Sequence, residues 1–233
     1  MSEWWTYRPS DFLMFSARTY YRLFELYNAE LWPAQMLTVG LGLALWLALW
    51  QGRAGAPRAA CALMGAAWLW VAWAFHWQRF AGINWAATWY AVAFALQGAL
   101  LWAVAAIGTG DRGAAPRGRA RGLGLALLLM GLIAHPALGA LLGRPWQQAE
   151  VFGLAPDPTV LGTLGVLLIV QPRPTPRARA LAWLLWPIPL LWCGVTGMTL
   201  ATLHAADAGL LPAAALLAAG AAWRGARAVS ARP

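Results

Sequence analysis

Few side chains in this sequence could take part in chemistry, and they are the natural place to look for a binding or catalytic site. Only eight acidic residues and three histidines occur among 233 residues. The candidates for a ligand-binding site are three histidines, two acidic residues and one asparagine: His76, Asn84, His135, Glu150, Asp157 and His204. Imidazole and carboxylate groups bind metal ions and exchange protons near neutral pH. Any binding or acid–base chemistry is therefore expected among these residues.

Two candidates fall in the longest polar interruption between apolar segments, the sequence RPWQQAEVFGLAPDPTVLGTLG at residues 144–165. Asp157 directly precedes Pro158. This pair is typical of a helix start, with the carboxylate as N-cap and proline in the first turn. We expect Asp157 to cap this helix, and capping alone would explain its presence. If the helix start also binds a ligand, its acid favours a cationic or neutral polar ligand over an anion.

His135 differs from the other two histidines because it lies inside an apolar segment, next to Pro136. An ionisable residue within a membrane-spanning helix usually faces protein or water, and a proline can kink the helix beside a cavity. We expect His135 to line a cavity or to bond to another helix. His76 and His204 fall at predicted helix ends, where their side chains would alternatively anchor the helix at the membrane interface.

The composition indicates that a lipid bilayer surrounds the protein. Hydrophobic residues make up 61% of the chain and charged residues 11%, against roughly 25% charged residues in soluble domains. We predict an all-α, polytopic bundle with about seven transmembrane spans, and six spans as the alternative. The predicted spans cover residues 32–50, 59–77, 85–107, 122–142, 159–170, 180–202 and 210–223.

The distribution of arginines predicts the orientation. The chain has no lysine, and its arginines explain the formal net charge of +9. The loops after the first, third and fifth spans and the C-terminal tail hold two, four, three and three arginines, and the other loops hold one, one and none. Cytoplasmic loops are the arginine-rich ones. We therefore predict a multi-pass protein of a bacterial inner membrane, with its N-terminus outside, its C-terminus cytoplasmic and no nucleic-acid partner.

The chain before the first span predicts a surface helix. Between residues 10 and 31, Tyr20, Phe24, Tyr27 and Leu31 recur at helical spacing, and Ser10 and Ser16 are candidate N-caps. Such a helix usually lies in the headgroup plane, although a lid over an outer cavity is the alternative. We therefore divide the chain into an interfacial segment, 1–31, and a transmembrane domain, 32–233.

The fifth predicted span is too short to cross a bilayer. Residues 158–170 give about 20 Å of helix, whereas the hydrocarbon core is about 30 Å thick. Non-helical backbone at this depth must be buried in protein or line a cavity. The segment Val151 to Pro156 is therefore expected to dip into the membrane or to sit in a sheltered pocket.

The chain lacks the common catalytic and cofactor motifs. HExxH, GxSxG, the P-loop and CxxC are all absent, and Cys61 and Cys193 stand in apolar runs. Haem bound between two histidines would need both at one depth, whereas His135 is predicted to lie deeper than the others. The sequence therefore does not identify a metal or a cofactor, and it favours a non-enzymatic role.

The chain resembles a bacterial family of multi-span membrane proteins known as the domain of unknown function 6064. The resemblance covers most of the chain and rests on five pieces: FELYNAELWPAQ at 24–35, HWQRFAGIN at 76–84, HPALGALLG at 135–143, VFGLAPDPTVLGTLG at 151–165 and IPLLW at 188–192. Some relatives have cysteine where this chain has Asp157, so cysteine chemistry does not carry over to that position. The resemblance implies the membrane architecture and no activity.

Three functions follow from these observations. The first is the binding or passage of a small ligand or lipid through an outer-facing cavity with His135, Glu150, Asp157 and Asn84 in its wall. The second is a structural or assembly role beside other membrane subunits, which the 17 tryptophans and small-residue seams would suit. The third is an intramembrane enzyme that uses His135 with Glu150 or Asp157 as base and acid.

Overall fold

The computed structural model describes residues 14–107, 118–170 and 175–230, with side chains to residue 227. Within these ranges the chain is helical and contains no strand, so the predicted all-α class is confirmed. The helices are α1 (Ala17–Leu31), α2 (Ala34–Gln51), α3 (Ala56–Trp70), η3 (Val71–Trp77), η4 (Phe80–Gly82), α4 (Ala87–Ile107), α5 (Arg119–Leu129), η5 (Met130–Ala134), α6 (His135–Leu141), η6 (Trp146–Gln148), α7 (Pro156–Ile169), α8 (Pro176–Leu184), α9 (Pro187–Thr202) and α10 (Leu210–Ser230).

Five helical segments are long and apolar enough to cross a membrane. They cover Ala34–Gln51, Ala56–Gly82, Ala87–Ile107, Arg119–Leu141 and Pro176–Thr202. They match the first four predicted spans and the sixth, and α7 is a shorter apolar helix, as its sequence indicated. The predicted number of seven is therefore approximate, while the membrane character follows from the five long segments.

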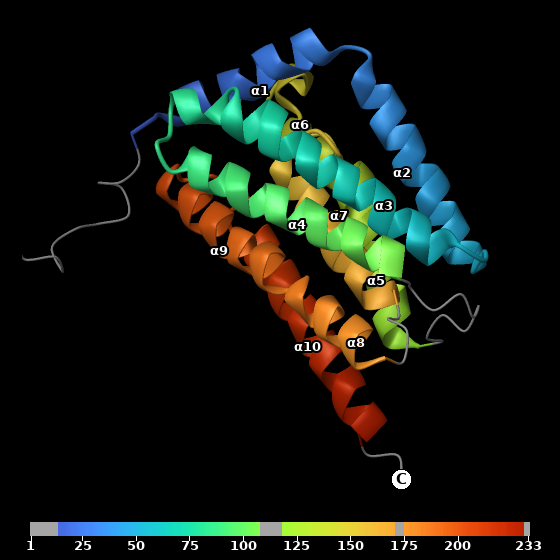
Figure 1. The fold of residues 1–233 in the computed structure, drawn as a ribbon. Coiled ribbons are helices and arrows are strands. Elements are labelled where there is room, and N and C mark those ends of the chain that lie inside the picture. The colour runs from blue at the N-terminus through green and yellow to red at the C-terminus, as the bar shows by residue number, and fades with distance from the viewer. Residues whose placement is uncertain (1–13, 108–117, 171–174, 231–233) are drawn as a thin grey trace, which may run out of the picture.

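Helix α1 lies across one end of the bundle (Figure 1), which we call the α1 end. Ser16 is its N-cap, and the Ser16 hydroxyl accepts a hydrogen bond from the Thr19 backbone N–H at 3.2 Å. Tyr20, Phe24 and Tyr27 are buried on one face, as their spacing predicted. Leu31 is half-buried, and Ser10 lies outside the described residues. The amphipathic helix thus packs onto the bundle through its aromatic face.

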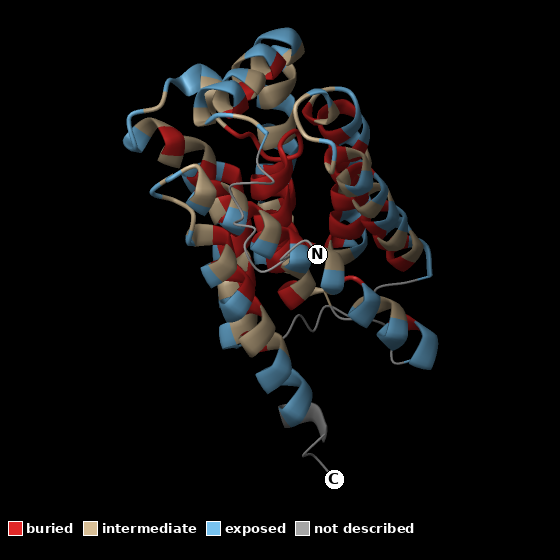
Figure 2. Ribbon diagram, turned by 90° about the vertical axis from the view of Figure 1, so that its left-hand side faces the viewer, coloured by how far each residue is buried: buried red, intermediate tan, exposed pale blue. Residues whose placement is uncertain are grey.

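Helix α7 occupies the centre of the bundle, where buried residues run along the middle of the fold (Figure 2). It packs closely against α5, because both helices have glycine at the contact. A Cβ atom on Gly165 would lie 2.4 Å from the Gly124 carbonyl oxygen, and one on Gly131 in η5 would lie 2.5 Å from the Pro158 carbonyl oxygen. Small residues let membrane helices approach this closely.

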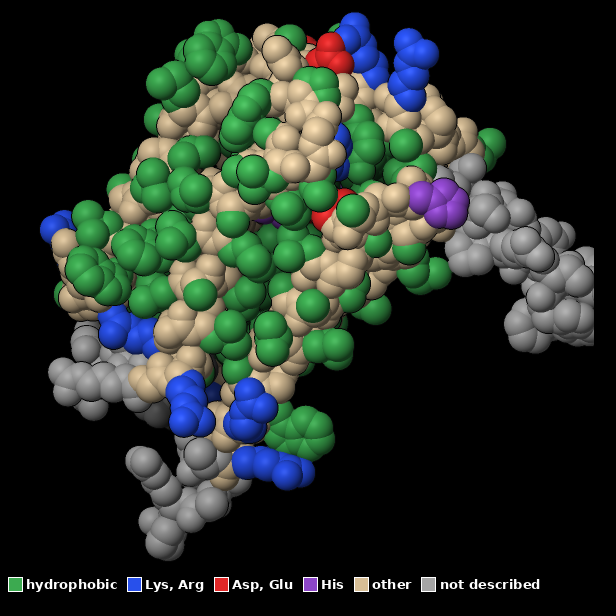
Figure 3. All heavy atoms as spheres, turned by 180° about the vertical axis from the view of Figure 1, so that it is seen from behind, with side chains coloured by type: hydrophobic (Ala, Val, Ile, Leu, Met, Phe, Trp, Pro, Cys, Tyr) green, Lys and Arg blue, Asp and Glu red, His purple; other side chains and the backbone are tan. Residues whose placement is uncertain are grey.

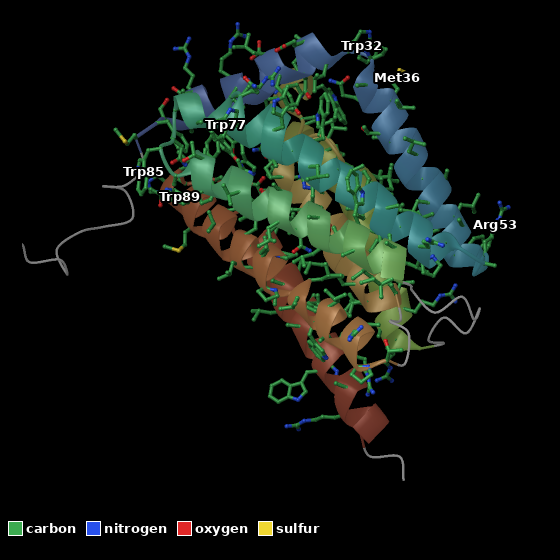
Figure 4. The ribbon with its side chains drawn as sticks, viewed as in Figure 1. Trp32, Met36, Arg53, Trp77, Trp85 and Trp89 are labelled. Carbon is green, nitrogen blue, oxygen red and sulfur yellow. The ribbon has the colours of Figure 1, made fainter. Side chains whose placement is uncertain are left out.

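The outer surface has the pattern expected for a bilayer. Figure 3 shows a broad hydrophobic surface with basic side chains gathered towards the two ends. Trp32, Trp77, Trp85 and Trp89 lie at or near the α1 end (Figure 4) and are more than half exposed. Arg53 marks the opposite end of α2. Tryptophans are enriched where a membrane protein meets the headgroups, so these residues fit an interfacial belt.

Two of the membrane helices contain a π-helical segment, and each segment either contains a histidine or directly precedes one. His76 lies within η3, and η5 ends directly before His135, the first residue of α6. Pro136 stands in the first turn of α6. The irregularity expected from His135–Pro136 is therefore a π-helical turn just before the histidine. Such turns occur frequently at functional sites.

Candidate functional site

Three of the sequence-predicted site residues converge in one buried cluster. His135 begins α6, Glu150 lies in the loop before α7, and Asp157 is in the first turn of α7. Each offers one ligand atom, and these atoms all lie within 4.8 Å of one another. The residues are 6%, 6% and 0% exposed. We call this group the His–Glu–Asp cluster.

Asp157 is held by side chains of α9 and does not cap its helix. Trp192 Nε1 donates to Oδ1 and Thr196 Oγ1 donates to Oδ2, both at 2.7 Å. Helix α7 begins at Pro156, two residues earlier than a cap at Asp157 requires, and its N-cap is Ala155. The predicted capping role is therefore wrong, because the carboxylate points to α9 and not to its own helix start.

The turn before α7 is stabilised by Thr159. Its hydroxyl accepts from the Gly153 N–H at 2.9 Å and donates to the Ala155 carbonyl at 2.7 Å. Gly153 has a φ of 79°, a conformation that favours glycine. Every residue from Val151 to Ala155 is buried. Protein therefore encloses this segment, as both predicted arrangements require.

Two buried polar atoms of the cluster have no protein partner. His135 Nδ1 and Glu150 Oε2 have no hydrogen bond within the described part of the chain. Burial raises the pKa of Glu150 well above its ordinary value, the charge of Asp157 raises it further, and Arg144 lowers it. A buried polar group without a partner is costly. The cluster therefore has an unfilled capacity to bind a ligand.

An ion pair lies close to the cluster. Arg144 donates to Asp207 Oδ2 at 2.7 Å, and its guanidinium lies 4.4 Å from the centre of the Tyr21 ring. The two charged side chains are 18% and 8% exposed. These contacts connect α1, the loop before α7 and the turn between α9 and α10. In the sequence, Arg144 is one of two arginines in the predicted outer loops between spans, which are otherwise free of arginine.

His76 lies one aromatic ring away from Asp157. Its ring centre is 4.4 Å from that of Phe94 and 5.0 Å from that of Trp192, the indole that donates to Asp157. His76 is fully buried, and neither ring nitrogen has a hydrogen-bond partner among the described residues. His76 therefore packs against Trp192 behind the cluster. It is enclosed by protein, whereas a residue that anchors a helix end would be exposed at the membrane interface.

Asn84 and His204 lie outside the cluster. Asn84 Oδ1 accepts from the Ala86 N–H at 3.0 Å in the turn before α4. His204 is exposed, with a φ of 55°, in the turn after α9. Both are at chain turns, as the sequence indicated. The structure does not bring either of them to His135, Glu150 and Asp157.

Two cavities run along α1. The larger, about 890 Å³, lies beside Arg18, Tyr21, Arg22, Glu30 and Arg79, among others. The smaller, about 650 Å³, has Pro136, Ala149 and Val151 in its wall, each adjacent in sequence to His135 or Glu150. The described lining of the smaller cavity thus includes sequence neighbours of the cluster but not His135, Glu150 or Asp157 themselves.

The cluster combines an imidazole with two carboxyl groups, which can bind a cation or hold a shared proton. Trp192 and Thr159 lie within pieces of the sequence that carry the family resemblance, but nothing in the sequence indicated that they, or Thr196, hold the cluster and its turn in place.

No curated protein and no solved structure matches this chain. Residues 17–230, nearly the whole chain, match a family of unknown function, and the chain belongs to this family (DUF6064).

Proposed function

We propose that this integral membrane protein binds a small cation at His135, Glu150 and Asp157. The observation that supports the proposal is the convergence of these ionisable groups from three separate segments. They approach within 4.8 Å of one another and are almost completely buried. Two of their atoms have no partner among the described residues.

Charge balance favours a cation over an anion or a neutral ligand. Two carboxyl groups and a neutral imidazole carry up to two negative charges. Both oxygens of Asp157 accept a hydrogen bond, which suits a carboxylate. The nearest arginine, Arg144, is already paired with Asp207. Buried charges need a partner or a bound ion, and a cation supplies the missing positive charge.

A ligand would approach the cluster from the α1 end, the predicted outer side. The smaller cavity of about 650 Å³ is lined by Pro136, Ala149 and Val151, the sequence neighbours of His135 and Glu150. Its size is typical of small-molecule sites, roughly 300–1,000 Å³. Helix α1 covers this region, which favours its alternative role as a lid.

The proposal is tested by thermal unfolding of the purified protein in lipid nanodiscs. The probes are chloride salts of Na⁺, K⁺, Mg²⁺, Ca²⁺, Mn²⁺, Zn²⁺ and choline. At a hundredfold excess over Kd, a cation that binds only the folded state should raise the unfolding temperature by about 5–10 °C. We expect this rise for at least one probe.

The variants Asp157→Asn and Glu150→Gln should lose that rise. Glu30→Gln is the matched control, because Glu30 is an exposed acid that pairs with Arg79 away from the cluster. Its response to the cation should equal that of the unmodified protein. A panel in which no cation distinguishes the unmodified protein from Asp157→Asn would overturn the proposal.

A further inference from the structure

We infer that the cation is a divalent transition-metal ion, of the Zn²⁺ or Mn²⁺ class, held by one imidazole nitrogen and two carboxylate oxygens. This inference rests on the proposed function and narrows its ligand. It uses the donor types of the cluster, their spacing, the groups that hold them and the local charge.

The donor types select the class of metal. Mg²⁺ and Ca²⁺ prefer sites made only of oxygen atoms. Imidazole is a preferred ligand of Zn²⁺ and of other transition metals, and carboxylates also bind Zn²⁺ and Mn²⁺. His135 supplies the nitrogen, while Glu150 and Asp157 supply the oxygens. Three protein ligands leave at least one coordination position for water or another ligand.

The spacing is compatible with a metal after a small adjustment. A tetrahedral Zn²⁺ with bonds of about 2.1 Å holds its ligand atoms roughly 3.4 Å apart. In the cluster these atoms lie within 4.8 Å of one another, so the side chains must close by up to about 1.4 Å. Glu150 is in a loop, and its Oε2 is not held by a hydrogen bond in the described structure. Its side chain can therefore make this movement.

The groups around the ligands resemble the outer contacts of a metal site. Trp192 and Thr196 donate to the two oxygens of Asp157 and fix its orientation. Hydrogen bonds of this kind orient metal ligands, and their loss typically weakens metal affinity 10- to 100-fold. Trp192 and Thr196 would be positioning residues.

Charge also fits a divalent ion. Two carboxylates carry two negative charges, which an M²⁺ ion neutralises. Arg144 does not occupy the cluster, because its guanidinium is held by Asp207 and by the Tyr21 ring.

The test measures Zn²⁺ affinity of the full chain in nanodiscs by competition with a chromophoric chelator, together with the visible spectrum after Co²⁺ loading. We expect one bound ion per chain and the intense visible bands of four-coordinate Co²⁺. His135→Gln, Glu150→Gln and Asp157→Asn should each weaken Zn²⁺ binding at least 100-fold. Thr196→Val should weaken it about 10-fold.

His204→Gln is the matched control, since His204 is an exposed histidine outside the cluster. It should retain the Zn²⁺ affinity and the Co²⁺ spectrum. A loss of binding in His204→Gln that equals the loss in His135→Gln would overturn the inference, because the metal would then sit on the surface. Each variant is first checked for monodispersity and helical circular dichroism, and Glu150→Gln replaces Asp157→Asn where the latter does not fold.

The two proposals fail in different ways. If Na⁺, K⁺, Mg²⁺, Ca²⁺ or choline stabilises the protein through Asp157 while Zn²⁺ and Mn²⁺ do not, the transition-metal inference is wrong and the cation site remains. If no cation acts through Asp157, both are wrong.

Discussion

Helices α2 and α7 have similarly apolar sequences and opposite surroundings. In α7, 13 of 14 residues are buried, whereas in the 18-residue α2 only Gly42, Leu45 and Leu49 are. Helix α2 is long enough to cross a membrane and α7 is not. Hydrophobicity therefore does not distinguish a helix that faces lipid from one that faces protein, but length and the placement of small residues do.

The two environments follow from what each helix must contact. Helix α7 is enclosed by other helices, so it does not need to match the bilayer thickness, and its N-terminal end can hold a carboxylate away from lipid. Helix α2 presents leucine, methionine and tryptophan side chains outward. This face would be covered by lipid or, in the alternative that the sequence predicts, by another membrane subunit.

The largest expected contrast comes from leucine truncation. Leu161 in α7 is 0% exposed and Leu41 in α2 is 45% exposed. Leu161→Ala should lower the free energy of unfolding by about 2–5 kcal/mol, because it leaves a cavity. Leu41→Ala should change it by less than about 0.5 kcal/mol. Denaturant titration in mixed micelles measures both, and equal losses would contradict the contrast.

A smaller contrast is expected from glycine substitution. A Cβ atom on Gly165 would lie 2.4 Å from a backbone oxygen of α5, while one on Gly40 in α2 would meet no atom within 4 Å. Gly165→Ala should cost about 2–3 kcal/mol because the helix backbones must separate. Gly40→Ala should be neutral or slightly stabilising. The same titration checks this pair; a tolerated Gly165→Ala would mean that α5 and α7 do not pack closely.

The smallest contrast concerns a single hydroxyl group. Thr163 accepts a buried hydrogen bond from Trp68 Nε1 at 2.7 Å, whereas Thr38 in α2 only donates to the Gln35 carbonyl at 3.1 Å. Thr163→Val should cost about 1–2 kcal/mol, because the buried indole N–H loses its acceptor. Thr38→Val should cost less than about 0.5 kcal/mol. Trp68→Phe in the Thr163→Val background isolates the pair in a double-mutant cycle.

The sequence predicted what depends on local composition and not what depends on contacts between distant segments. Apolar length predicted the long helices, and aromatic spacing predicted the buried face of α1. The scarcity of ionisable residues was enough to select His135, Glu150 and Asp157. The same reasoning also selected Asn84 and His204, which the structure places elsewhere.

The contacts that hold the site were not predictable. Trp192 and Thr196 meet Asp157 across 35 and 39 residues of sequence, and Arg144 meets Asp207 across 63. No periodicity or motif records such pairs. The local Asp–Pro pattern indicated that Asp157 caps its helix. The Asp157 carboxylate instead accepts hydrogen bonds from Trp192 and Thr196 of α9.

The π-helical segments η3 and η5 make the position of the two buried histidines depend on the number of residues as well as on their identity. A π-helical turn contains about one residue more than an α-helical turn. Because a π-helical N–H bonds to the carbonyl five residues back, the turn absorbs this extra residue, and deleting one residue from Met130–Ala134 would restore α-helical bonding with His135 near its present orientation. Deleting one residue from the regular helix α5 would instead rotate His135 by about 100° relative to the chain before the deletion. Within this family, a single-residue gap at η5 should therefore be compatible with the site, whereas a gap within α5 should remove it even in a chain that keeps every one of its ligands.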